Sequence, residues 1–130
     1  GFIDSSFGKK EVDFLKLRTI DYEALIKIGI GEFFSLDSLY KKYSVEAEKM
    51  RPPLFLLIQH IEYIINLVGV DYVGLGSDFD GINLKPMEMD DVATYPLITK
   101  ALVEKGYSKK DVIKILGGNF LRVLQANEEK

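Results

Sequence analysis

The sequence contains no cysteine, which excludes disulfide bonds, thiolate metal sites and cysteine nucleophiles from all 130 residues. This absence is compatible with a reducing compartment but does not determine the compartment. Our expectation is a cytoplasmic protein. Histidine is nearly absent as well, because His60 is the single one. Zinc sites usually need several histidine or cysteine ligands, so none can be built from such residues here. We therefore expect His60, which lies between apolar residues, to be a core or supporting histidine rather than a metal ligand.

Long apolar runs and an excess of positive charge are also missing. The longest apolar run, Leu54–Ile58, is far shorter than the ~20 residues that a membrane-spanning helix needs. The first ten residues lack the apolar centre of a signal peptide and resemble the end of an earlier element. The 17 basic and 20 acidic residues are interspersed, so the net charge of −3 gives no reason to expect a nucleic acid or an anionic membrane as partner.

The sequence does contain a short apolar segment that leads into carboxylates, VDYVGLGSDFDG at Val70–Gly81. Its first part, Val70–Gly76, predicts a β-strand, and Asp78, Asp80 and Gly81 follow at its exit. Parallel strands buried on both faces are nearly continuous apolar runs, and they deliver catalytic side chains to the carboxyl end of a sheet. We therefore predict an α/β fold with one clear barrel strand at about residues 70–76.

The rest of the sequence is dominated by helical patterns, with glycine, proline and serine at the positions where helices begin and end. Helices are predicted over residues 9–28 with an interruption near 19–21, from Ser35 to about Met50, from Leu54 to Val68, from Pro96 to about Lys105, from Ser108 onward, and from Asn119 to about Gln125. Gly29–Gly31, Arg51–Pro53 and Gly69 are the expected breaks between them. In Leu54–Val68 the apolar stripe is wide enough that this helix must pack against something large.

A single strand among so many helices cannot be buried alone. Each buried backbone group without a partner costs ~1–3 kcal/mol, and a whole domain is stable by only ~5–15 kcal/mol. Partner strands would have to come from weak candidates, Phe2–Ile3 or Gly31–Phe34, or from another chain. We infer that most of the sheet belongs to sequence outside these 130 residues.

The two aspartates at the strand exit could bind a hard cation or transfer a proton. If the backbone is extended, Asp78 and Asp80 share a face, and Gly81 allows a sharp turn. A calcium-binding EF-hand loop is excluded, because Asn83 and Met89 stand where that loop needs glycine and glutamate. The alternative for this pair is an ordinary role in capping a turn.

Longer motifs in the same region resemble the renal (membrane) dipeptidase family. The run HIEYIINLVGVDYVGLGSDFDGI at His60–Ile82 looks like the helix and strand of that family that end in G-[SG]-D-F-D-G. Two later motifs agree in the right order, DDVATYP at Asp90–Pro96 and GGNFLRVL at Gly117–Leu124. The opening GFID is similar to the segment after the family's seventh barrel strand. The resemblance is strong after Pro52 and loose before it.

This resemblance implies the C-terminal part of a distorted (β/α)8 barrel with a two-zinc site that hydrolyses dipeptides and related small amides. The family's metal ligands are histidines, an aspartate and a glutamate on earlier strands, and none has a counterpart here. A full barrel takes ~250 residues, so the length also fits part of one. The chain alone is therefore expected to be inactive.

One catalytic residue of the family maps onto this chain. The resemblance implies that Asp78 carries a proton between the attacking water and the leaving amine. Three further matching positions are expected to be structural or supporting: Asp80, Gly81 and His60. The family's substrate-binding arginine lies upstream, so none of the arginines takes that role: Arg18, Arg51 and Arg122.

These expectations define one segment with two parts. Residues 1–53 would be a helical insertion after a preceding strand, and residues 54–130 the last helix–strand–helix units of a barrel. The alternative is a non-catalytic helical binding or assembly module derived from the same family. A third possibility is self-association through exposed strand edges, since the sheet needs either the rest of the barrel or a second copy.

Overall fold

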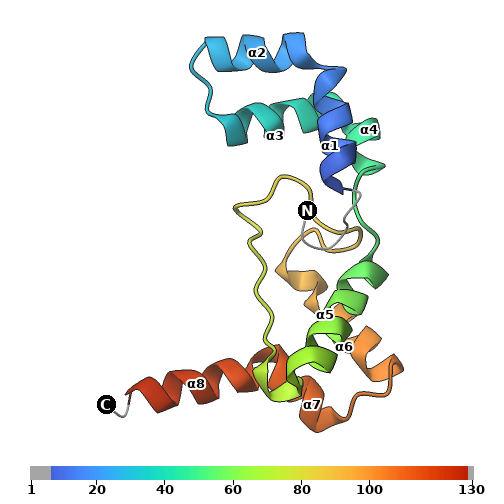
Figure 1. The fold of residues 1–130 in the computed structure, drawn as a ribbon, viewed down its shortest axis with the longest axis vertical. Helices are drawn as coiled ribbons and strands as arrows, with labels where there is room; N and C mark the ends of the chain where they lie inside the picture. Colours follow the sequence, from blue (N-terminus) through green and yellow to red (C-terminus); the bar gives the residue numbers. More distant parts are fainter. Residues whose placement is uncertain (1–6, 129–130) are drawn as a thin grey trace.

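A computed structural model describes residues 7–128, and the described chain is built from helices that form an upper and a lower group (Figure 1). The upper group contains α1 (Phe7–Lys16), α2 (Thr19–Lys27), α3 (Glu32–Lys42) and α4 (Ser44–Glu48). The lower group contains α5 (Leu54–Val68), the short 3-10 turns η1 (Val70–Tyr72) and η2 (Val92–Thr94), α6 (Tyr95–Glu104), α7 (Lys109–Ile113), the π-helical turn η3 (Lys114–Gly118) and α8 (Asn119–Glu128). No helix of this described range is long and apolar enough to cross a membrane.

The predicted strand over residues 70–76 is wrong for this chain. Its first three residues form η1, and extended backbone begins only at Val73, with φ −110° and ψ 135°. Residues 7–128 contain no strand, because a strand exists only when a neighbour pairs with its backbone. One proposed partner, Gly31–Phe34, overlaps the start of α3, and the other, Phe2–Ile3, lies outside the described residues. What is left at this position is an extended segment without a partner.

The predictions based on proline, glycine and serine in the second half are confirmed. Helix α5 begins directly after Pro53 and ends at Gly69, whose φ of 89° belongs to the left-handed region that glycine tolerates. Pro96 lies in the first turn of α6. Ser108 caps α7, because its Oγ accepts a hydrogen bond from the Asp111 backbone N–H at 3.2 Å. Helix α8 begins at Asn119, as predicted.

The predicted helix from Ser35 to Met50 is wrong in its start and in its continuity. Helix α3 begins three residues earlier, at Glu32, after the extended backbone of Gly31. Ser35 is therefore inside the helix, fully buried, and its Oγ donates to the Ile30 carbonyl at 3.2 Å. The helix also stops at Lys42, and a separate short helix, α4, follows. In the earlier segment, the predicted interruption near residues 19–21 falls two residues sooner, between α1 and α2.

Two hydrophobic clusters hold the helices together. The N-terminal cluster joins α1, α3, α4 and the residue before Arg51 through Phe14, Leu39, Tyr40, Ala47 and Met50. The C-terminal cluster joins α5, α6, α7, η3, the extended segment and the loop after it through Ile58, Ile61, Val73, Met89, Ile98, Leu102, Val112 and Ile115. The long connection after the extended segment runs from the lower to the upper group (Figure 1), where Leu84 packs on the N-terminal cluster.

Large apolar side chains also lie on the surface of the lower group. Those of α8, which projects away from the other helices (Figure 1), are Phe120, Leu121, Val123 and Leu124. Those of α5 are Phe55, Tyr63, Leu67 and Val68. Several large apolar side chains exposed on one helix are typical of a face that another structure covers.

Candidate active site

Asp78 lies at the end of the extended segment, at the start of a tight turn. Its backbone carbonyl accepts hydrogen bonds from the N–H groups of Gly81 at 3.0 Å and Ile82 at 3.1 Å. The turn brings the Asp78 side chain over the α-carbon of Gly81. A β-carbon at position 81 would lie 2.7 Å from the Asp78 Cγ, closer than real β-carbons come to other atoms. Glycine at position 81 therefore leaves the room that the Asp78 carboxylate occupies.

A cavity of about 250 Å³ opens beside this carboxylate. It lies between the extended segment, the following loop, and the starts of α5 and α6. Its lining is mostly apolar. Ser77, Asp78 and Tyr95 carry polar groups, and the other lining residues are Leu57, Leu75, Gly76, Phe79, Ile82, Pro86, Met89 and Ile98. A carboxylate at the edge of an apolar cavity can accept a proton from a small bound molecule or pair with an amine on it.

The other predicted site residues do not line this cavity. Asp80 is exposed, and no hydrogen bond or ion pair joins its side chain to any residue that the structure describes. His60 is half-buried on α5 and lies outside the lining set. Gly81 contributes through its close approach to Asp78. The structure thus brings Gly81 to Asp78 and leaves Asp80 and His60 apart from the cavity.

Metal ligands are the next requirement of the predicted chemistry. Over the described residues 7–128, no group of three or more histidine, cysteine, aspartate or glutamate side chains is placed to hold a metal ion. The donors in this range therefore do not fit a zinc pair, which needs several such groups around each ion.

Asn119 fixes the start of the extended segment, and the residue patterns did not identify it. Its side chain is buried, and Nδ2 donates to the carbonyls of Val70 at 2.7 Å and Val73 at 2.8 Å. Arg122 adds a bond from Nη2 to the Asp71 carbonyl at 2.7 Å. The available signal was a polar residue directly after Gly117–Gly118, at the start of an apolar helix. These bonds attach the segment that leads to Asp78 to the start of α8.

Asp71, next to these contacts, forms an ion pair with Lys114. The hydrogen bond from Lys114 is the main cause that lowers the pKa of the Asp71 carboxyl below its ordinary value, and burial opposes it. This pair links η1 to η3 and strengthens the same attachment.

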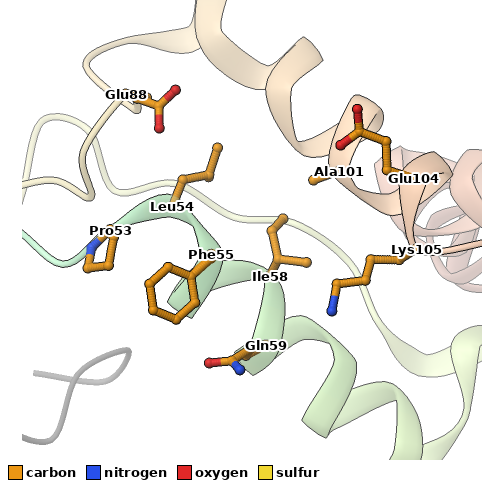
Figure 2. Close-up of a pocket in the computed structure, with 9 residues that line it drawn as sticks. All are labelled: Pro53, Leu54, Phe55, Ile58, Gln59, Glu88, Ala101, Glu104 and Lys105. Atoms are coloured by element: carbon orange, nitrogen blue, oxygen red, sulfur yellow. The ribbon is translucent and has the colours of Figure 1, made fainter.

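A larger cavity of about 490 Å³ lies elsewhere, between the start of α5 and the end of α6 (Figure 2). Its apolar wall includes Leu54, Phe55 and Ile58. Glu88 and Glu104 stand on opposite sides of it in Figure 2, and Lys105 binds Glu62 at 2.9 Å. Asp78 is not part of this lining, so the larger cavity is separate from the predicted catalytic residue.

Comparison with known proteins identifies a family whose members are similar to this chain. The family model described as membrane dipeptidase (peptidase family M19) matches residues 20–130. A dipeptidase of Aspergillus oryzae, aclJ, is 41% identical over 87 residues, which are 67% of this chain and 21% of that protein. An uncharacterized dipeptidase of Schizosaccharomyces pombe is 39% identical over 113 residues, 86% of this chain and 27% of that protein.

A bacterial relative shows the same partial coverage. An uncharacterized protein from the pqqA 5′ region of Klebsiella pneumoniae is 48% identical over 73 residues, 56% of this chain and 27% of that protein. The chain thus spans between about a fifth and about a quarter of the length of these relatives. No solved structure matches it significantly.

Proposed function

Because the chain belongs to the membrane dipeptidase family, we propose that it is the C-terminal part of a metallodipeptidase that hydrolyses dipeptides and related small amides. The observation that carries this proposal is the place of Asp78, a carboxylate in a glycine-dependent turn beside an apolar cavity of about 250 Å³. The short matched share of each relative supports a role as one part of a larger enzyme.

Asp78 is proposed to move the proton that amide hydrolysis requires. Its carboxylate accepts a proton from the attacking water and delivers it to the leaving amine, a role worth ~10²–10⁴-fold in rate. The apolar lining residues accept an uncharged part of the substrate, and Asp78 itself is exposed in the described chain. Gly81 leaves the space that this carboxylate occupies.

The family's chemistry also needs metal, which we propose to be two zinc ions. The donors within residues 7–128 do not fit such a site, so its ligands would belong to sequence outside this chain. The chain by itself is therefore proposed to be inactive.

The rest of a (β/α)8 barrel would complete the structure. In the described chain, no hydrogen bond reaches the backbone of residues 74–77, and several large apolar side chains of α5 and α8 are exposed. Neighbouring strands of a barrel would pair with the backbone of residues 74–77, and neighbouring elements would cover the apolar side chains of α5 and α8. The exposed apolar surface also supports the alternative, a non-catalytic binding or assembly module. The intact mass of the natural protein distinguishes these two proposals. A mass of ~40 kDa or more, about the size of a whole barrel enzyme, supports the proposal that the chain is part of an enzyme.

The proposal is tested in the complete protein that carries this chain, loaded with zinc and given a dipeptide. Asp78→Asn should lower kcat by ~10²–10⁴-fold. Asp80→Asn is the matched control, since this nearby carboxylate lies outside the cavity lining, and its kcat should stay within about threefold of the parent. Equal kcat values for the parent and Asp78→Asn would refute the role of Asp78. Hydrolysis by the 130-residue chain alone, abolished by Asp78→Asn, would refute its inactivity.

A further inference from the structure

The loop of residues 82–91 forms one wall of the Asp78 cavity without regular secondary structure of its own. Three of its side chains line the cavity: Ile82, Pro86 and Met89. It also contains Glu88, whose φ of 67° is a left-handed conformation that is unfavourable for a residue with a β-carbon. Such a conformation persists only when the surrounding contacts determine it. Something must therefore hold this loop in place.

Arg51 supplies most of these contacts. Its Nε donates to the Lys85 carbonyl at 2.9 Å, and its Nη2 donates to the Pro86 carbonyl at 2.8 Å. The same Nη2 binds Asp90 Oδ1 at 2.7 Å. The third nitrogen, Nη1, binds the Glu48 carboxylate at 3.1 Å. A planar guanidinium can donate hydrogen bonds to all of these acceptors at once, whereas the positive charge of a lysine ammonium is concentrated on a single nitrogen.

The position of Arg51 in the chain explains why it can act as an anchor. It lies between Met50, which is buried in the N-terminal cluster, and Pro52, which is also buried. The Pro52 carbonyl adds another bond to the loop, because it accepts from the Met87 N–H at 2.8 Å. Only 13% of the Arg51 side chain is exposed, so solvent competes little for its part-buried bonds to the Lys85 and Pro86 carbonyls.

We propose that Arg51 is a positioning residue, which holds residues 82–91 against the Asp78 cavity and thereby sets the shape of the substrate-binding wall. It does not touch the substrate or the transferred proton. Its effect on catalysis rests on the proposed function, but its effect on the loop does not.

The first test measures hydrogen exchange of residues 82–91 in the full 130-residue chain. Arg51→Met should accelerate exchange of the Met87 amide by about 10-fold or more, the effect of losing charge-assisted hydrogen bonds. Arg51→Lys should restore less than half of this protection, because lysine lacks the planar fork. The matched control is Arg18→Met. The Arg18 side chain is equally buried, at 12% exposure, but it binds Glu46 and stacks on Phe14, and it has no hydrogen bond or ion pair to residues 82–91.

Loop exchange that is unchanged in Arg51→Met, or equally accelerated in Arg18→Met, would overturn the proposal. If Arg51→Met unfolds the chain, Asp90→Ala serves instead, because it removes one acceptor and leaves the guanidinium in place. It should accelerate exchange in the same loop, and unchanged exchange would count against the proposal.

The second test measures kinetics in the complete enzyme. Arg51→Met should raise KM by about 5- to 10-fold, with kcat and its pH profile nearly unchanged, since the wall shifts while Asp78 stays. A fall in kcat with KM unchanged would contradict a positioning role. If the parent has no dipeptidase activity, the proposed function fails while the exchange measurement still decides the role of Arg51.

Discussion

The Asp78 carboxylate occupies the space where a side chain at position 81 would stand. The Gly81 N–H donates to the Asp78 carbonyl at 3.0 Å, and this turn brings the α-carbon of Gly81 under the Asp78 side chain. The proposed proton carrier and the glycine three residues later therefore form one unit. Replacement of either should affect the same chemistry.

Gly81→Ala should displace the Asp78 carboxylate and lower activity with little loss of stability. The new β-carbon would come within 2.7 Å of the Asp78 Cγ, and the short aspartate side chain must rotate away. We expect kcat of the complete enzyme to fall by ~10–100-fold, since misplacement of a catalytic group by about 1 Å can cost 10²-fold. The control is Gly31→Ala, where a β-carbon meets no atom within 4 Å. Equal kcat values for the two variants would contradict the close approach.

Asn119→Ala should destabilise the lower group of helices. The substitution leaves the Val70 and Val73 carbonyls without their donor, and a buried group without a partner costs ~1–3 kcal/mol. Denaturant unfolding followed by circular dichroism measures this loss. Asn127→Ala removes a bond of the same type, to the Val123 carbonyl, on the exposed part of α8. The control should change stability by no more than ~0.5 kcal/mol, and a similar loss in both variants would be evidence against the role of Asn119.

Leu102→Ala should open a cavity in the C-terminal cluster. Leu102 is fully buried, and leucine-to-alanine changes at such sites cost ~2–5 kcal/mol. Its neighbour Val103 is 55% exposed, so Val103→Ala provides a truncation on the same helix with a cost below ~1 kcal/mol. The unfolding midpoints of the two variants should differ clearly. Matching midpoints would show that the cluster is packed differently.

Stability should fall in acid partly through Asp71. The bond from Lys114 lowers the Asp71 pKa in the folded chain below its ordinary value of 3.8. Above pH 3.8 the Asp71 carboxyl is ionised in the unfolded chain as well, so its pair with Lys114 makes its full contribution to the free energy of unfolding. This contribution is lost as the pH falls through the lower pKa of the folded chain. Asp71→Asn should therefore weaken the dependence of the unfolding midpoint on pH between about pH 5 and 2. Asp80→Asn, which removes a carboxylate with no partner among the described residues, should leave this dependence as it is.

The sequence predicted those features that depend on neighbouring residues. Helix α5 starts after Pro53 and stops at Gly69, and Ser108 caps α7, because each signal acts within a few residues. The strand failed because pairing depends on a partner that the described chain does not contain. Asp78 was predicted as a site residue from a motif, and the cavity beside it was seen only in the structure.

Arg51 and Asn119 were missed for a further physical reason. Their bonds join residues 34 to 49 positions apart, such as Arg51 to Lys85 and Asn119 to Val70. No local periodicity encodes such a contact. For Ser35 the error was to rely on a local signal. Serine often caps a helix, but here Ser35 is buried inside α3.

The two hydrophobic clusters imply that this chain has no single free energy of unfolding. Each cluster is built almost wholly from residues contiguous in sequence, and Leu84 is the exception. Each can therefore open as its own cooperative unit, as subglobal unfolding in other proteins does. The border between the two units lies at Arg51–Pro53, where the anchor of the loop is also found. A denaturant titration should then show two transitions, and Leu102→Ala should move only one of them.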